Sequence, residues 1–425
     1  MWNEKNRPSV PLSAKRVAHL KVSVAVLTLA AMITTLAVHG YRSLRDVVLP
    51  LERLTVVTGA NGVGKSNLYR AFQLLADTAS GRFIGSIAAA GGLSSVLWAG
   101  PEQISAAMRR GDVPIQGTGS RKAPISLQLG FTTDDLGYLI DVGLPVPEHP
   151  PSIFGRDPII KREIIWAGPI LRPAATLLER TARGVRVAED AGRASNRASG
   201  HIEVGLPPWA SVLDELVDPI HRPEATAVRD VVRGWRFYDS FRVDPDAPAR
   251  LPQVGTRTEV LAADGQDLAP TIATIVESAW EGPFREAIAD AFAGTRVAIA
   301  DQAGRFELEL HQPGLLRPLT GRELSDGTLR YLLLAAALFS PRPPGLMVLN
   351  EPETSLHPDV LPALTRLMAR AAERTQLVVV SHSRPLVEAL AGAGALHHEL
   401  VKPYGETEVD GQGLLSRPTW HWGRR

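Results

Sequence analysis

The chain has 425 residues, enough for roughly two to three domains with a large buried core. Hydrophobic residues make up 44% and charged residues 21%, which is ordinary for a globular protein and excludes wholesale disorder. The formal net charge is +1, so a surface that binds nucleic acid must be a local basic patch. With no cysteine, the chain has no disulfide, no thiol chemistry and no cysteine metal site.

Two interpretations compete for the N-terminus. Residues 1–21 are basic and precede a mostly apolar stretch at 22–38, a pattern typical of a short signal or membrane anchor. Residues 34–44 instead alternate and turn like a first strand, and an anchor would take residues that this strand needs. We therefore expect residues 1–31 to be an upstream extension, the functional chain to begin near Met32, and the membrane to play no part.

The remaining chain alternates strand and helix patterns. Residues 124–190 contain alternating segments separated by proline and glycine, which indicates an antiparallel sheet. The strand–helix–strand order of the C-terminal half predicts a parallel sheet. We expect strands at 54–58, 305–311, 346–349 and 377–380, and helices at 67–76, 209–217, 270–279, 324–338 and 358–374.

The strongest motif is GANGVGKS at residues 59–66, a complete G-x-x-x-x-G-K-S between an apolar strand and a helix. Its glycines let successive N–H groups face an anion, and the helix adds its positive N-terminal end. Lys65 is one of seven lysines among 46 basic residues, and its compact ammonium suits the β- and γ-phosphates where a guanidinium would be too bulky. The predicted nucleotide-binding residues here are Gly59, Asn61, Gly62, Val63, Gly64, Lys65, Ser66 and Asn67, with Ser66 as a Mg²⁺ ligand.

A second motif, LMVLNEPE at 346–353, ends a buried strand with polar residues. Glu351 is placed to orient or activate a water beside the phosphates. Asn350 stands where a Mg²⁺-linked carboxylate is expected; its amide accepts a hydrogen bond but lacks the negative charge that holds the cation. The competing interpretation is a core strand with a solvated end.

Two weaker signals complete the set. Ser325 can cap the helix that follows it, and Gly327 lies among exposed N–H groups that make a second anion site. His382 follows the strand at 377–380 and could contact a γ-phosphate. Each alone would indicate an ordinary helix cap or a structural histidine; the order of the four motifs favours function.

Together, GANGVGKS, LSDGT, LNEPETSLHP and VVSHS resemble an ABC-type ATPase head of the RecF/SMC kind, among the predicted AAA-type ATPases. The opening VHGYRSL and the helix entry LSDGTLRYLLL fit RecF-like members best, and the resemblance covers about 32–395. It implies an α/β P-loop NTPase of ABC-head type, with a mixed sheet, an antiparallel β subdomain and a helical lobe. The expected units are a first ATPase lobe at 32–195, a mainly helical insertion at 196–300, a second ATPase lobe at 301–400 and a tail at 401–425.

The resemblance also implies roles. ATP would lie between two protomers, with Ser325 and Gly327 of one completing the site of the other and residues 354–357 crossing the seam. Glu351 would be the catalytic carboxylate, His382 the γ-phosphate sensor, and Arg42 and Ser43 would lie near the nucleotide. Asn350 departs from the usual aspartate, which puts Mg²⁺ affinity and turnover in question but not ATP binding. The Q-loop glutamine stays open among Gln103, Gln128 and Gln253.

The segment 233–239, RGWRFYD, interleaves aromatic residues with arginine and resembles a nucleic-acid contact. We favour the alternative, an aromatic strand packed in the core with arginines at its edge. The doublet at 397–398 is expected on the surface, and no metal site beyond Mg²⁺ is expected.

The preferred hypothesis is a cytoplasmic ATPase that dimerises on ATP and acts on DNA in repair or recombination. The second is a defence or signalling switch that controls a separately encoded effector with little hydrolysis; Asn350 favours it. A transporter energy subunit is a third class, against which LSDGT and EPETSLHP speak.

Overall fold

The computed structural model describes residues 32–101, 105–110, 112, 126–146, 150, 152–188, 201–202, 205–219, 222–413 and 415–423. The expected extension at 1–31 and Gln103 lie outside these residues. Residues 33–41 form the first strand, as the alternation predicts, so the apolar stretch at 22–38 ends inside a strand. Within the described ranges, no helix is both long and apolar enough to cross a membrane.

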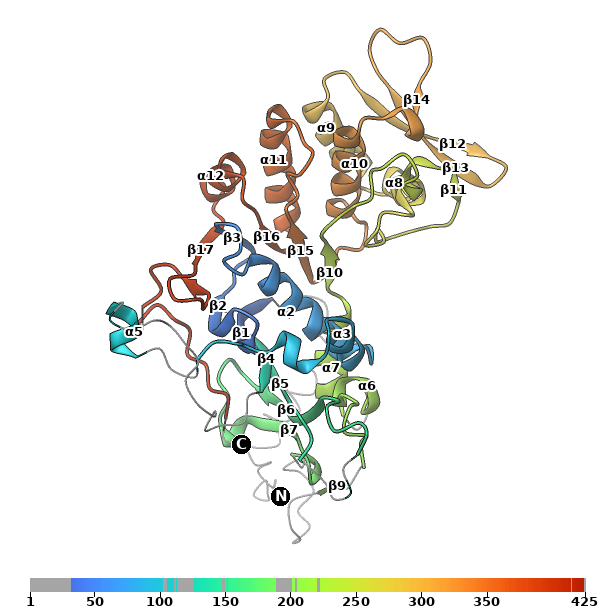
Figure 1. Ribbon diagram of the computed structural model, residues 1–425. Helices are drawn as coiled ribbons and strands as arrows, with labels where there is room; N and C mark the ends of the chain where they lie inside the picture. The colour runs from blue at the N-terminus through green and yellow to red at the C-terminus, as the bar shows by residue number, and fades with distance from the viewer. Residues whose placement is uncertain are drawn as a thin grey trace, which may run out of the picture.

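An antiparallel sheet forms the lower part of the molecule in Figure 1, in the order β2-β1-β4-β5-β6-β7-β8-β9. It contains the segment in which we predicted antiparallel strands. Its strands are β1 (Ile33–Tyr41), β2 (Leu44–Pro50), β4 (Leu127–Thr133), β5 (Leu136–Gly143), β6 (Ile159–Ala167), β7 (Thr176–Thr181), β8 (Gly184–Val187) and β9 (His201–Ile202).

A second sheet has the order β10-β15-β16-β3-β17-β18, and all its pairs are parallel except β17 with β18. Figure 1 shows it at the centre of the molecule, beside α2 (Lys65–Thr78). Its strands are β3 (Leu54–Gly59), β10 (Arg236–Tyr238), β15 (Leu346–Asn350), β16 (Gln376–Val380), β17 (Leu396–Val401) and β18 (Glu408–Val409).

Both faces of the parallel sheet are buried, which explains its uninterrupted apolar strands. Val57, Val348 and Val378 face the core that α2 and the antiparallel sheet share. Val56 and Leu349 point the other way, into a second core. This core is shared with the helices of the upper lobe, which comprises residues 240–338. Because α2 contacts β1 and β4 as well as β3 and β15, it joins the two sheets.

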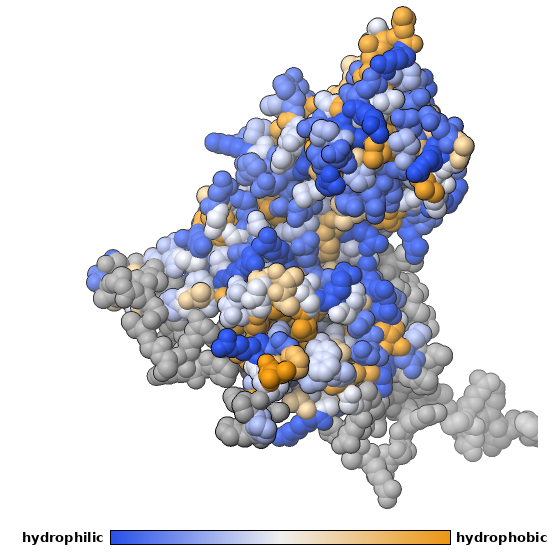
Figure 2. Space-filling view, turned by 45° about the vertical axis from the view of Figure 1, so that its right-hand side comes forward, coloured by the Kyte–Doolittle hydropathy of each residue, from blue (hydrophilic) through white to orange (hydrophobic). Residues whose placement is uncertain are grey.

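The upper lobe combines helices with a small sheet (Figure 1). The stretch 196–300, expected to be a mainly helical insertion, also contributes strands: β10 to the central sheet, and β11 (Gln253–Val254) and β12 (Arg296–Gln302) to the small one. β13 (Arg305–His311) and β14 (Leu319–Thr320) complete that sheet. Figure 2 shows a mainly hydrophilic face with apolar residues at the upper tip. The loop that joins β13 and β14 exposes Leu316.

The helices follow the expected positions with one shorter element. Of the helix expected at 209–217, only residues 212–215 are helical, and they form α6. The helix starts after Ser211, whose hydroxyl accepts from the Leu213 N–H as an N-cap, and a proline at 219 limits its extension. The helices are α2, α3 (Phe83–Ala89), α4 (Leu93–Val96), α5 (Ala106–Arg110), α6 (Val212–Glu215), α7 (Pro223–Arg233), α8 (Leu268–Val276), α9 (Glu281–Ala291), α10 (Asp326–Leu338), α11 (Leu361–Ala372) and α12 (Arg384–Gly392).

Candidate functional site

The parallel register brings most of the sequence motifs to one edge of the central sheet. Val57 pairs with Val380, and Val380 pairs with Asn350. The glycine-rich loop, Glu351 and His382 therefore leave three neighbouring strands at the same carboxyl edge, where α/β proteins place ligands.

The loop at 59–66 wraps tightly between β3 and α2. Gly64 precedes the helix at φ 118°, a conformation that favours glycine. The Lys65 ammonium donates to the carbonyls of Gly59 at 2.6 Å and Ala60 at 3.1 Å. Burial lowers the pKa of Lys65, while the carboxylates of Glu351 and Glu353 act in the opposite direction. Lys65 is therefore a buried cation held inside the curve of the loop.

Polar residues from segments far apart in the sequence form hydrogen bonds that support the loop. The Asn67 side-chain amide donates to the Ser43 hydroxyl at 2.9 Å, and Arg42 approaches Asn67 at 3.5 Å. The Thr407 hydroxyl bonds Ser43 at 2.8 Å and also donates to the Val63 carbonyl. The predicted residues Arg42, Ser43, Val63 and Asn67 thus form one network, and Thr407 is a member that the sequence did not identify.

Glu351 and His382 lie together, and Glu353 holds the loop that carries His382. His382 Nδ1 is 3.5 Å from a Glu351 carboxylate oxygen. Glu351 has φ 48°, an unfavourable conformation for a residue with a side chain; its N–H donates to Val380 O at 2.7 Å and its carbonyl accepts from Arg330 at 3.1 Å. One Glu353 oxygen accepts from the Ser381 hydroxyl at 2.6 Å and from two backbone N–H groups of the His382 loop.

Among the described residues, the second Glu353 oxygen has no hydrogen-bond partner although the side chain is only 7% exposed. A buried orphan carboxylate oxygen beside a phosphate-binding loop fits a hydrated cation. Glu353 lies within the LMVLNEPE motif, but its role depends on contacts that the motif does not reveal.

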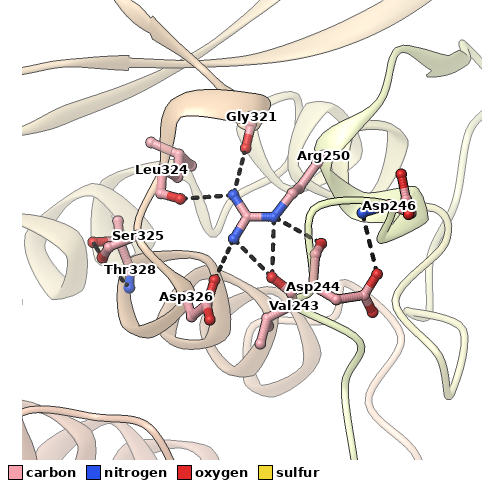
Figure 3. Close-up of polar contacts among 9 residues, drawn as sticks. All are labelled: Val243, Asp244, Asp246, Arg250, Gly321, Leu324, Ser325, Asp326 and Thr328. Carbon is pink, nitrogen blue, oxygen red and sulfur yellow. Dashed lines mark hydrogen bonds and ion pairs between the residues drawn. The ribbon is translucent and has the colours of Figure 1, made fainter.

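Arg250, which no sequence motif identified, fixes the signature segment, the LSDGT of residues 324–328 that leads into α10 (Figure 3). The Ser325 hydroxyl caps α10 by accepting from the Thr328 N–H at 3.2 Å. Arg250, which is 4% exposed, donates to the Gly321 and Leu324 carbonyls and pairs with Asp326 at 2.6 Å. On its other side it donates to the carbonyls of Val243 and Asp244.

The signature does not meet the loop of its own chain. Across the described residues, no hydrogen bond joins Ser325 or Gly327 to residues 59–66. Gly327 instead packs on the segment 354–357, where a Cβ on it would lie 2.8 Å from the Ser355 carbonyl oxygen. The structure therefore brings together all predicted site residues except Ser325 and Gly327, which form a second surface on the upper lobe.

The described glutamine candidates are occupied elsewhere. Gln128 donates to Asp141 inside the antiparallel sheet, and Gln253 binds the Ala269 N–H and the Pro248 carbonyl. In the segment 233–239 the packing interpretation holds, since Trp235 and Tyr238 are buried in the two cores. His398 is buried, contrary to the expectation that both histidines of the doublet lie on the surface, because its ring reaches the Pro50 carbonyl.

These features define a P-loop NTPase of ABC-head type: a G-x-x-x-x-G-K-S loop and the acidic Glu351 at one sheet edge, with the LSDGT segment and α10 on the upper lobe. A family model described as "AAA domain, putative AbiEii toxin, Type IV TA system" matches residues 54–388, and the chain belongs to this family. The predicted α/β P-loop fold and the predicted membership of the AAA-type ATPases are confirmed.

Solved structures give weaker similarities. The chain is 15% identical to the SMC head domain from Thermotoga maritima, with 90% of this chain and 100% of that chain covered and a TM-score of 0.42. It is 14% identical to an Smc head bound to the C-terminal winged-helix domain of ScpA (90% and 99% covered, TM-score 0.47). It is 14% identical to an Smc head with an extended coiled coil bound to the ScpA C-terminal domain, derived from Pyrococcus furiosus (89% and 95%, 0.45). No curated protein matches the chain.

The family implies ATP and, typically, Mg²⁺, and the residues fit both. Ser66 is the second residue of α2 and is exposed, and Asn350 ends β15 at the same edge. Glu353, whose second carboxylate oxygen has no partner among the described residues, follows Asn350 by three residues. Within the described ranges no group of three histidine or acidic side chains could hold a metal alone. Phosphate oxygens must complete such a site, as is usual for Mg²⁺.

Proposed function

We propose that this protein is a cytoplasmic ATPase that binds Mg-ATP at residues 59–66 and hydrolyses it with Glu351. The observation that carries the proposal is the shared edge: Lys65, Glu351 and His382 leave three adjacent parallel strands and lie together. Lys65 neutralises phosphate charge, Glu351 accepts a proton from the attacking water, and His382 contacts the γ-phosphate. Because the reaction depends on electrostatic positioning, each role requires that this edge stay in place.

We further propose that two copies close over the nucleotide head to tail. Ser325 and Gly327 lie on the upper lobe and, among the described residues, make no hydrogen bond to their own loop, so a second copy would have to bring them to it. Glu351→Gln should trap the ATP-bound dimer, because it removes the base and leaves the binding residues in place. The measurement is the mass by size exclusion with light scattering in saturating Mg-ATP.

The matched control is Lys65→Ala, which should stay monomeric with ATP. The wild-type protein without nucleotide should also be monomeric. A Glu351→Gln protein that binds ATP yet stays monomeric would contradict the dimer, while a failure of wild-type protein to bind Mg-ATP would contradict the proposed activity itself.

DNA is the proposed substrate to which the ATPase couples, and a basic cavity supports it. A cavity of about 810 Å³ lies along α2, between α3 and the start of β10. Its one lining carboxylate among the described residues, Asp77, is already paired with Arg82 at 2.9 Å. The lining arginines are Arg42, Arg70, Arg82, Arg233 and Arg236. Such a cluster binds phosphates without reading bases.

The test of this surface is a double variant, Arg70→Glu with Arg233→Glu. It should weaken DNA binding across all sequences and lower the slope of log affinity against log salt by about 1 for each lost contact. ATP affinity should not change. Arg305→Glu, on β13 of the upper lobe, is the matched control. Unchanged DNA affinity and slope in the double variant would remove this cavity from the DNA surface.

A second candidate is an ATP-driven switch of a defence system that controls a separate effector and hydrolyses little. Asn350 favours it, since a neutral amide holds the cation less firmly than a carboxylate. The description of the family, a putative toxin of a type IV toxin–antitoxin system, also supports it. Phosphate release with and without DNA separates the two: DNA-stimulated turnover supports repair or recombination, and near-zero turnover in both supports the switch.

A further inference from the structure

The strand register places a carboxylate beside Asn350. β10 runs parallel to β15, with Tyr238 opposite Leu349, so the next residues on the two strands, Asp239 and Asn350, leave the sheet at the same level. Adjacent strands lie about 4.8 Å apart. Asp239 therefore belongs to the same carboxyl edge as Glu351 and His382, one strand further from the phosphate-binding loop.

Two neighbours locate the Asp239 side chain more closely. Its charge raises the pKa of Arg330, whose pKa is lowered overall by burial and which also feels Glu353 and Glu351. The charge of Asp239 adds to burial in raising the pKa of Tyr69, which is one turn along α2 from Ser66. Asp239 thus follows the end of β10 and is near enough to Arg330 and Tyr69 for its charge to act on both.

The Asp239 carboxylate is available for a ligand. Asp239 is exposed, and among the described residues its side chain makes no hydrogen bond and no ion pair. Arg330 is only 6% exposed, and it donates its hydrogen bond to the Glu351 carbonyl and not to Asp239. Among the described residues, the Nε of Arg330 has no hydrogen-bond partner. The Asn350 amide is neutral and cannot offer a cation a negatively charged oxygen. The unpaired carboxylate of Asp239, on the neighbouring strand, can.

We propose that Asp239 supplies the carboxylate that holds the nucleotide's Mg²⁺, in place of the aspartate that Asn350 replaces. The proposal rests on the proposed binding of Mg-ATP at residues 59–66. Mg²⁺ takes one or two carboxylates together with phosphate oxygens, and it keeps several waters, so Asp239 can act directly or through a metal-bound water. The chain thereby keeps the charge of the site while moving it from β15 to β10.

The proposal predicts that a carboxylate at position 350 can replace the one at position 239. ATP affinity is measured by titration calorimetry, first with EDTA and then as a function of Mg²⁺. Asp239→Asn should raise the Mg²⁺ concentration needed for half-maximal binding at least about tenfold, the effect typical of a lost metal contact. Its affinity for ATP in EDTA should equal that of wild type. The double variant Asp239→Asn with Asn350→Asp should return the Mg²⁺ requirement to within about threefold of wild type.

Asp134→Asn, in the exposed turn after β4, is the matched control, and thermal unfolding of every variant reports on folding. An unchanged Mg²⁺ requirement in Asp239→Asn would overturn the proposal. A raised requirement that Asn350→Asp does not restore would assign Asp239 to the neutralisation of Arg330 and would overturn it as well. Wild-type protein that binds no ATP with Mg²⁺ would instead refute the proposed function, so the two failures are distinguishable.

Discussion

Arg250 and Asp326 form a 2.6 Å ion pair that ties the start of the signature helix to a segment 76 residues earlier in the chain. The guanidinium also donates to four backbone carbonyls around it (Figure 3). Lysine could not replace it, because an ammonium has three donors and no planar fork. Arg250 therefore sets the position of Ser325 and Gly327 relative to the rest of the upper lobe.

We expect Arg250→Lys to weaken ATP-dependent dimerisation while leaving the Mg-ATP affinity of the monomer unchanged. The glycine-rich loop lies on the other lobe, whereas the signature segment loses hydrogen bonds to its buried carbonyls, at a cost of roughly 1–3 kcal/mol in unfolding free energy. Analytical ultracentrifugation with ATP in the Glu351→Gln background measures the dimer. Arg242→Lys, an exposed arginine paired with Asp244, is the control. Normal dimerisation of Arg250→Lys would refute the role.

Lys65→Ala should abolish nucleotide binding. Its ammonium is buried inside the loop and is the cation placed to meet the β- and γ-phosphates. Lys402→Ala is a demanding control, because Lys402 contacts the same loop at the Gly62 carbonyl, at 3.4 Å, but is exposed. Equilibrium binding of labelled ATP with Mg²⁺ should fall below detection for the first and stay near wild type for the second. Equal losses would mean that net charge, not position, matters.

The sequence predicted the elements that carry their own local signal. The glycine-rich loop and the apolar strands before Asn350 and His382 are recognisable because short-range chemistry determines them: glycine conformation, helix dipole and burial on both sheet faces. Their meeting at one edge also follows, since successive parallel strands end together.

Arg250, Thr407 and Asp239 could not be found in this way. Each acts through a partner more than 70 residues away, and nothing near it in the chain marks it. Asp239 in particular gains its meaning from the pairing of β10 with β15, a register that depends on the whole topology. The aromatic residues beside Asp239 in the sequence predict core packing, and Trp235 and Tyr238 are indeed buried. The same pattern predicts nothing about the carboxylate.

Gly64→Ala should impair the loop more than its size suggests. At φ 118° an alanine is strained, and its Cβ would collide with the hydroxyls of Thr407 and Ser43. We expect at least about a tenfold loss in ATP affinity, equal to 1.4 kcal/mol. Gly282→Ala in α9, where a Cβ meets open space, should have no effect on binding. Calorimetry measures both, and wild-type affinity in Gly64→Ala would show that the loop can relax.

The buried His398 ring is a source of acid sensitivity close to the site. Its neighbour His397 contacts Thr58, and both histidines lie on β17 next to the strand that ends in the phosphate-binding loop. Because the Pro50 carbonyl can only accept, the His398 Nε2 must carry a hydrogen and donate to it, at 2.9 Å.

Burial lowers the pKa of His398 below its ordinary 6.5, with the charge of His397 acting in the same direction and the Pro50 contact and Glu52 opposing it. The folded state thus prefers neutral histidine, so its contribution to stability is complete above pH 6.5 and is lost as the pH falls through the folded pKa. His398→Gln keeps a donor without titrating, and should flatten the fall in unfolding free energy as the pH drops below 6.5, measured by urea unfolding. His421→Gln, exposed in the tail, should keep the wild-type slope; an unchanged slope in His398→Gln would place the acid sensitivity elsewhere.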